Sequence, residues 1–315
     1  MLVLHDPLRQ TDLPRGCIAT IGNFDGMHVG HQAIVRGVVE RARGLGRPSA
    51  VITFEPHPLS IVAPNRMPKQ ILTIGQKEEL LRDMEVDALL IVPFTHEFSR
   101  WTADRFIEDF LVRALRVAEV RIGRDFCFGA GREGNLERLE EAGKRFGFDV
   151  RGVDDVRIRG MRVSSSIVRE AISKGAIRCV NIALGRTYFI DGRVATGRRL
   201  GRKIGFPTVN VDPANELFAG GGVYITTSRF ESFNRSFESV TNIGVRPTLY
   251  ENYAITIESH ILDFDSNVYD DTVRLYFHEL IRREKQFRSA LELTEQIRRD
   301  IERTRGYFRR HPLHV

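Results

Sequence analysis

The stretch GNFDGMHVGH, residues 22–31, stands between an apolar run at residues 17–22 and a pattern of helical period at residues 31–46. Glycines let a backbone approach a ligand closely, and the free N–H groups at the start of a helix favour phosphate. His28 and His31 flank Gly30 as H-x-G-H, so two imidazoles can donate hydrogen bonds to phosphate oxygens as charge develops in a transition state. The alternative interpretation is that one histidine caps the helix and the other packs. The stretch therefore predicts a strand–turn–helix unit that binds phosphate.

Short apolar runs and helical patterns alternate through the rest of the first half. The expected strands are residues 17–22, 49–54, 88–94, 117–123 and 149–156, and the expected helices are residues 31–46, 77–84, 103–115 and 136–147. Alternation of this kind implies a parallel sheet covered on both faces. Ligands are then expected beyond the carboxyl ends of its strands.

The pattern changes after about Gly185. Strand-like segments then follow one another without helices between them, at residues 188–195, 207–212, 221–230, 238–244, 254–264 and 271–280. They predict an antiparallel sheet or a small barrel. An amphipathic helix within residues 281–310 closes the chain, and its expected packing stripe is Phe287, Leu291, Thr294, Ile297 and Ile301. We therefore expect two domains, residues 1–185 and residues 186–315.

Composition excludes several classes of protein. Of the 315 residues, 42% are hydrophobic and 28% charged, which argues against a disordered or collagen-like chain. No stretch approaches the roughly 18 apolar residues of a membrane span, and the first residues do not resemble a secretory signal. Cys17, Cys127 and Cys179 show no CxxC spacing, so neither a disulfide framework nor a zinc site is expected. We expect a cytoplasmic protein without a membrane partner.

The net charge of +6 is concentrated near the end of the chain. Residues 281–310 hold ten Lys or Arg and five Asp or Glu. Charges on such a helix are more typical of a solvated face than of a nucleic-acid footprint, so no nucleic-acid partner is expected. A basic nucleic-acid-binding protein stays open as an alternative, and the oligomeric state is left open.

A second glycine-rich stretch, GRRLGRKIGFPTVN at residues 197–210, precedes a short polar strand. It is not a Walker A loop, because Lys203 has the wrong offset and Ile204 replaces Ser or Thr. Its backbone N–H groups and basic side chains can still cradle phosphates. Thr208 and Asn210 alternate onto one face of a strand and offer oxygen ligands that suit Mg²⁺. The alternative is a basic hairpin loop with polar turn residues.

A third motif, GAGREG at residues 129–134, formally matches the G-x-G-x-x-G of dinucleotide-binding enzymes. It follows RDFCF rather than a clean buried strand, and the helix after it, NLERLEE, has little of the small apolar surface that this fingerprint requires. A dehydrogenase is therefore the weaker interpretation.

Together these motifs resemble the bifunctional bacterial riboflavin kinase/FMN adenylyltransferase (FAD synthetase) family. The resemblance in the first half includes G-N-F-D-G-x-H-x-G-H at residues 22–31, TFEPHP at 53–58, GRDFCFG at 123–129 and VSSSIVR at 163–169. In the second half it includes residues 197–210, GVY at 222–224, NIGVRPT at 242–248, Glu258 and RREKQF at 282–287. The motifs stand in the family's order from about residue 15 to 303. The resemblance implies a Rossmann-like nucleotidyltransferase domain and a riboflavin kinase β-barrel closed by a helix.

The resemblance also implies a division of roles. Catalytic roles fall on His28, His31 and Arg169 in adenylyl transfer and on Glu258, as general base, in the kinase step. Nucleotide and flavin contacts of the first domain fall on Gly22, Asn23, Phe24, Asp25, Gly26, Gly123, Asp125, Phe126, Ser165 and Ser166. Those of the second fall on Gly197, Gly201, Lys203, Gly205, Pro207 and Asn242, with Thr208 and Asn210 as Mg²⁺ ligands. The small-molecule partners are riboflavin, ATP as co-substrate, and FMN and FAD as intermediate and product.

The chain departs from the family pattern at several positions. Cys127 stands where the family usually has Arg, which removes a cation near the expected flavin side. Ser166, Asn135, Val209 and Asp270 replace Thr, Asp, Ala and Gly respectively. None of these departures touches the two histidines or Glu258. A different adenylyltransferase or cytidylyltransferase stays open as an alternative, although it leaves the second domain unexplained.

Overall fold

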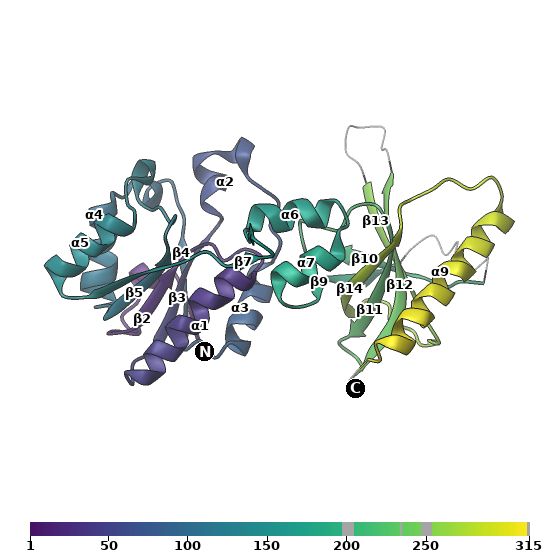
Figure 1. Cartoon of the computed structure of the whole chain (residues 1–315), viewed down its shortest axis with the longest axis horizontal. Coiled ribbons are helices and arrows are strands. Elements are labelled where there is room, and N and C mark those ends of the chain that lie inside the picture. Colours follow the sequence, from purple (N-terminus) through teal and green to yellow (C-terminus); the bar gives the residue numbers. More distant parts are fainter. Residues whose placement is uncertain (197–204, 234, 247–253, 314–315) are drawn as a thin grey trace. The chain divides into compact units, whose positions relative to one another are not determined.

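The structure is a computed structural model that describes residues 1–196, 205–233, 235–246 and 254–313. The chain folds into two compact units, Met1–Ser165 and Ser166–Val315. The first is built on a parallel sheet and the second on a barrel (Figure 1). Among the described residues, no helix combines the length and the apolar character needed to cross a membrane.

The sheet of the first unit has the strand order β1-β4-β3-β2-β5-β6. Its strands are β1 (Leu2–His5), β2 (Ile18–Ile21), β3 (Ser49–Glu55), β4 (Ala88–Pro93), β5 (Glu119–Gly123) and β6 (Asp149–Val153). Every neighbouring pair is parallel, as the alternating pattern predicts. The edge strand β1 is not predicted from the sequence, because it is four residues long and lies before the first helix signal.

Helices cover this sheet on both faces, as predicted (Figure 1). The elements are η1 (Pro7–Arg9), α1 (Val29–Gly44), α2 (Pro58–Val62), η2 (Pro64–Arg66), α3 (Ile74–Asp83), η3 (Phe98–Arg100), α4 (Ala103–Arg105), η4 (Phe106–Ala114), η5 (Ala130–Arg132) and α5 (Leu136–Phe146). Val38 and Ala42 of α1 pack on Ile18, whereas Phe110 and Leu139 join the core on the other face. A hairpin of β7 (Arg157–Ile158) and β8 (Met161–Arg162) completes the unit.

The second unit is a closed barrel of strand order β10-β13-β12-β11-β14-β9, which confirms the predicted antiparallel β domain. The strands are β9 (Tyr188–Ala195), β10 (Val209–Pro213), β11 (Gly222–Phe230), β12 (Ser236–Arg246), β13 (Ala254–Ile261) and β14 (Thr272–Arg282). Helices α6 (Ser165–Ser173), α7 (Ile177–Leu184) and α9 (Ala290–Arg310) accompany them.

The last helix begins later than the charge pattern suggests. Strand β14 continues to Arg282, and α9 begins only after Ser289, whose side chain accepts from the N–H of Glu292. The predicted packing stripe is also wrong in part, because Leu291 is 67% exposed. The buried face carries Asp300, Thr304 and Phe308 instead. A local pattern misses this face because two of its three residues are polar and are buried only with partners: Asp300 pairs with Arg282, and the Thr304 hydroxyl donates to the Asp300 carbonyl.

Candidate active sites

The two histidines of the first unit meet at the start of α1, directly beyond the carboxyl end of β2. His28 is the N-cap residue of α1, and its Nδ1 accepts from the backbone N–H of His31 at 3.3 Å. The two rings stack with centroids 3.7 Å apart. Because Nδ1 of His28 acts as an acceptor, a neutral His28 ring carries its proton on Nε2 and can donate from there. The alternative interpretation, in which one histidine caps the helix, is thus correct for His28, and it does not prevent Nε2 from donating.

Gly30 explains the spacing of the H-x-G-H motif. A Cβ built at this position would lie 3.1 Å from both Cε1 and Nδ1 of His28, which is tighter than ordinary contact. The absence of a side chain therefore lets the His28 ring lie against the first turn of the helix. Gly26 serves the same loop differently: its φ is +83°, and an added Cβ would lie 2.8 Å from Ile71 Cδ1. Gly30 is thus required by close approach, and Gly26 by its left-handed backbone conformation as well.

Asp25 anchors this loop to the rest of the unit. Its carboxylate is 3% exposed and accepts from the backbone N–H groups of Ile71 and Leu72 at 3.0–3.1 Å. The Ser165 hydroxyl donates to the Asp25 carbonyl at 2.9 Å. A carboxylate held by two backbone donors is a positioning group, so Asp25 fixes the loop that carries His28.

Three further side chains around this loop receive no role from the sequence. His57 lies with Nε2 3.2 Å from Asn23 Nδ2, and its Nδ1 accepts from the N–H of Leu59 at the start of α2. Lys77 of α3 donates to Thr53 Oγ1 at 3.3 Å. The Thr53 hydroxyl lies 3.4 Å from the Asn23 carbonyl oxygen. His57 and Thr53 belong to the TFEPHP motif, whereas Lys77 carries no motif signal.

The segment after β5 holds the residues expected on the flavin side. Gly123 ends β5, and the N–H of Phe126 donates to its carbonyl at 3.0 Å. Phe126 is half-buried and stacks on Phe128. Asp125 forms an ion pair with Arg162 of the β7–β8 hairpin. Cys127 is half-buried, with Sγ 3.6 Å from the Asp125 carbonyl oxygen, so a thiol hydrogen-bonded to the local backbone stands where the resemblance leads us to expect an arginine.

Other expected residues of the first site lie in different places. Phe24 is 2% exposed and adopts a φ of 48°, so it supports the loop from inside. Gly22 lies against the Phe24 ring, 3.2 Å from an added Cβ. Ser165 is the last residue of the first compact unit, whereas Ser166 and Arg169 belong to the second. Their roles in adenylyl transfer stay predictions.

The barrel aligns three of the expected residues of the second site. Asn210 of β10 pairs with Glu258 of β13, and Glu258 pairs in turn with Asn242 of β12. Directly opposed residues of neighbouring strands place their side chains on the same face. Residues 210 and 242 are far apart in sequence, yet the register puts a carboxylate between two amides. Such a row can hold a hydroxyl for deprotonation by Glu258.

Thr208 lies one residue before β10, so the expectation that Thr208 and Asn210 share one strand holds only for Asn210. The segment before Thr208 is held by His260, whose Nδ1 lies 2.7 Å from the Pro207 carbonyl. Gly205 is exposed with φ +86°. Gly197, Gly201 and Lys203 lie outside the described residues, as does most of the basic loop.

Glu284, which the sequence presents only as part of RREKQF, borders the same row. A Cβ built at Gly244 would lie 3.2 Å from Glu284 Oε1 and 2.8 Å from Thr256 Oγ1. A Cβ at Gly221 would lie 2.9 Å from Glu284 Oε2. Gly221 and Gly244 therefore leave room for a second carboxylate beside the barrel strands.

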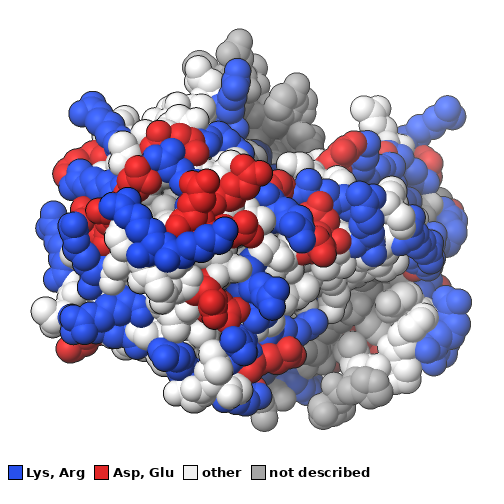
Figure 2. All heavy atoms as spheres, turned by 60° about the vertical axis from the view of Figure 1, so that its left-hand side comes forward, with Lys and Arg blue, Asp and Glu red and all other residues white. Residues whose placement is uncertain are grey.

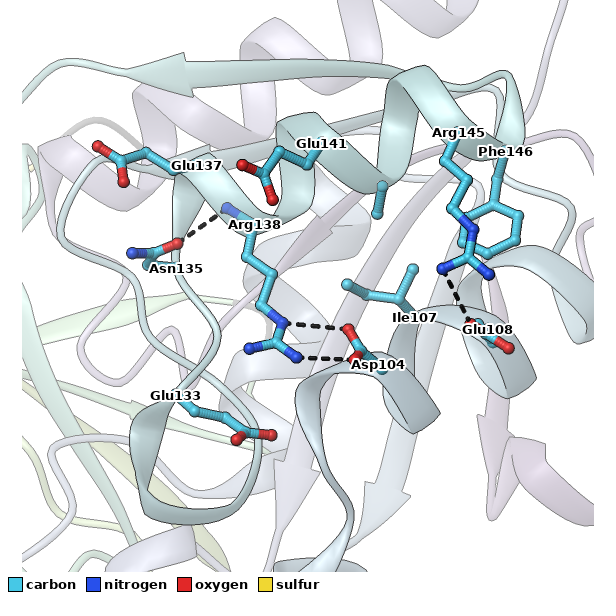
Figure 3. Close-up of a pocket in the computed structure, with 11 residues that line it drawn as sticks. Asp104, Ile107, Glu108, Glu133, Asn135, Glu137, Arg138, Glu141, Arg145 and Phe146 are labelled. Carbon is cyan, nitrogen blue, oxygen red and sulfur yellow. Dashed lines mark hydrogen bonds and ion pairs between the residues drawn. The ribbon is translucent and has the colours of Figure 1, made fainter.

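A pocket of about 470 Å³ on the first unit contains none of the expected site residues (Figure 3). It lies between η4 and α5, and its lining includes Asp104, Glu108, Glu133, Arg138 and Arg145. Arg138 pairs with Asp104, and Arg145 with Glu108. On the face shown in Figure 2, acidic and basic side chains are interspersed in the same way. Such paired charges describe a solvated surface rather than a reaction site.

The GAGREG motif borders this pocket and does not form a dinucleotide fingerprint. Strand β5 ends at Gly123, six residues before Gly129, and Phe128 bridges Gly134 in an isolated antiparallel contact. The start of α5 is capped by Asn135, whose side chain accepts from the N–H of Arg138. The helix N-terminus is thus capped within the chain and does not follow the strand directly.

Comparison with known proteins assigns each half of the chain. A family profile described as FAD synthetase matches residues 10–167, and one described as riboflavin kinase matches residues 184–308. A bifunctional riboflavin kinase/FMN adenylyltransferase of Escherichia coli (strain K12) is 38% identical over 293 residues, which cover 93% of each chain. One of Haemophilus influenzae is 37% identical over 294 residues, which cover 93% of this chain and 95% of the relative.

A solved structure is similar over the whole chain. The crystal structure of a Streptococcus pneumoniae protein, described as a macrolide-efflux protein, matches with a TM-score of 0.88 at 26% identity. The match covers 97% of this chain and 99% of that one. The succession of a parallel-sheet unit and a barrel unit therefore recurs in a second protein.

Proposed function

Because the chain belongs to the bifunctional riboflavin kinase/FMN adenylyltransferase family, we propose how its residues divide the two reactions of that family. The enzyme phosphorylates riboflavin to FMN and adenylylates FMN to FAD, with ATP as co-substrate in both steps. A dehydrogenase is therefore excluded, and the second domain is accounted for.

We assign phosphorylation to the barrel. Glu258 accepts the proton of the riboflavin 5′-hydroxyl, whose oxygen bonds to the γ-phosphorus of ATP while ADP leaves. Asn210 and Asn242, on either side of Glu258, orient the hydroxyl and the phosphates. The oxygens of Thr208 and Asn210 suit Mg²⁺, which when bound would neutralise phosphate charge. Both side chains are half-buried, and Asn210 lies directly opposite Glu258, so their environment fits a magnesium ion.

We assign adenylyl transfer to the start of α1. A phosphate oxygen of FMN bonds to the α-phosphorus of ATP, and pyrophosphate leaves with the electrons of the broken bond. His28 and His31 donate hydrogen bonds to the charge that develops at the α-phosphate, and the positive end of the α1 dipole adds to this field. Ser165, Ser166 and Arg169 would steady the phosphate chain. No side-chain nucleophile is required, so catalysis is positioning plus electrostatics.

The domains of this proposal are residues 1–185 for adenylyl transfer and 186–315 for the kinase. The compact units divide at Ser165 instead, with α6 and α7 on the side of the barrel. The functional division therefore stays a proposal, as does a cytoplasmic location.

One observation carries the assignment: the histidine pair and the Glu258 row lie in different compact units. The test is to incubate each variant with riboflavin and ATP, or with FMN and ATP, and to resolve the flavins by chromatography. We expect His28→Ala to abolish adenylylation and retain phosphorylation, and Glu258→Gln to lower phosphorylation by about 10³-fold and retain adenylylation. Loss of both activities in either folded variant would contradict the two-site assignment.

A further inference from the structure

Lys77 is a buried cation that the assigned chemistry does not use. It is the fourth residue of α3, and only 6% of its surface is exposed. Burying an ammonium group is costly, and a cation in the first turn of a helix also opposes the helix dipole. The position is therefore unfavourable for stability for two reasons. This cost suggests that the charge of Lys77 has a function.

The contacts of Lys77 lead to the loop that carries His28. The ammonium donates to Thr53 Oγ1, and the Thr53 hydroxyl then directs its own proton to the Asn23 carbonyl. The donor order is unambiguous, because an ammonium has no acceptor and a carbonyl has no donor. Asn23 is thus held by a relay of two hydrogen bonds, from Lys77 of α3 to Thr53 and from Thr53 to the Asn23 carbonyl.

The segment just before α3 holds the loop at a second point. Asp25 accepts from the N–H groups of Ile71 and Leu72, which immediately precede α3. The capping box of Thr73 and Gln76 fixes the first turn, so this segment and Lys77 form one rigid support. The charged groups that act on Lys77 are Asp25 from the loop and Glu55 from the end of β3.

We propose that Lys77 is a positioning residue for adenylyl transfer: its ammonium, acting through Thr53, fixes the loop from Asn23 to His28 in the geometry that places the two histidines. The proposal rests on the assignment of adenylyl transfer to this loop. Lys77 is not itself assigned a contact with ATP or FMN. Its effect should therefore fall on kcat more than on the KM for ATP.

The charge of Lys77 is open to titration. Burial lowers the pKa of Lys77 below its usual 10.5, against the opposing effects of Asp25 and Glu55. A lysine whose pKa is lower in the folded state contributes stability that rises as the pH increases toward 10.5. The proposed positioning effect on the adenylylation rate should instead weaken as the pH rises, because deprotonation of Lys77 removes the positive charge that faces Asp25. If Lys77 had a purely structural role, the adenylylation rate and the stability would change in the same direction with pH. The proposal predicts that they change in opposite directions.

The experiment uses the full-length protein and compares Lys77→Met with Lys144→Met, the same change at an exposed lysine of α5. Adenylylation is measured with FMN and ATP, and phosphorylation with riboflavin and ATP. We expect Lys77→Met to lower the kcat of adenylylation by about 30-fold, with the KM for ATP changed less than about threefold. Phosphorylation and the Lys144→Met variant should match the wild type. The ratio of wild-type to Lys77→Met rates should decline as the pH rises toward 10.5.

Adenylylation within about threefold of wild type in Lys77→Met, or a rate ratio that does not change with pH, would overturn the proposal. If Lys77→Met does not fold, Thr53→Val decides, because it keeps the lysine and removes the relay. We expect Thr53→Val to lower kcat by about fivefold at unchanged KM, and a wild-type rate would overturn the proposal. Absence of adenylylation in the wild-type protein would instead refute the function assigned to the loop.

Discussion

Replacing Gly30 by alanine tests whether the contact between the His28 ring and α1 matters for catalysis. The new Cβ would lie 3.1 Å from Cε1 and Nδ1 of His28, whereas ordinary contact begins near 3.4 Å. The ring must therefore move by about 0.3 Å, which disturbs the hydrogen bond that its Nδ1 accepts from the N–H of His31. Misplacement by about 1 Å can cost 10²-fold in rate. In proportion, a shift of about 0.3 Å should lower the kcat of adenylylation about fourfold, which corresponds to about 0.8 kcal/mol.

The stability of this variant should change little. Alanine in a helix is favoured over glycine by up to about 1 kcal/mol, and loss of an N-cap hydrogen bond costs about 1 kcal/mol. The two terms oppose each other, so the melting temperature should stay within a few degrees of wild type. A slow enzyme of normal stability is the expected signature.

The matched control is Gly44→Ala in the same helix, because a Cβ built at Gly44 meets nothing within 4 Å. This control should retain full adenylylation. The assay follows FAD formed from FMN and ATP by fluorescence after chromatography, with phosphorylation of riboflavin measured in the same preparations. A Gly30→Ala enzyme that adenylylates FMN within about twofold of the control would refute the reasoning. An equal loss of phosphorylation would refute it too.

Two further predictions concern the barrel unit. Burial lowers the pKa of His278 from 6.5 to about 4. Below pH 6.5 the unfolded chain therefore binds a proton more readily than the folded unit does. We expect this unit to lose about 3 kcal/mol of stability as the pH falls from 6.5 to 4. Urea unfolding across this range should show a weaker pH dependence in His278→Gln, which can keep the hydrogen bond to Thr227; an unchanged dependence would contradict the prediction. Arg282→Met leaves Asp300, 3% exposed, without its cation and should destabilise the unit by about 3–5 kcal/mol. The double variant Arg282→Met/Asp300→Leu should recover much of this loss, and the absence of recovery would argue against a buried ion pair as the cause.

Local sequence patterns predicted most of the secondary structure because the periodicity of each element is strong. The strand before residue 22, the helix after it and the six barrel strands all follow from alternation and turn residues. The edge strand Leu2–His5 was missed, since four residues carry too little periodicity. The face of α9 was missed because its buried residues are polar and their burial depends on partners from other elements.

The sequence by itself determined the order of the motifs, the change from alternating strands and helices to successive strands in the second half, and the family resemblance. Only the tertiary structure decided which side chains act together. Asn210, Glu258 and Asn242 meet because the barrel register opposes them, and Lys77 reaches Asn23 only through Thr53. The physical reason is that periodicity reports which face of an element is buried, whereas register and side-chain contacts depend on pairings between distant segments.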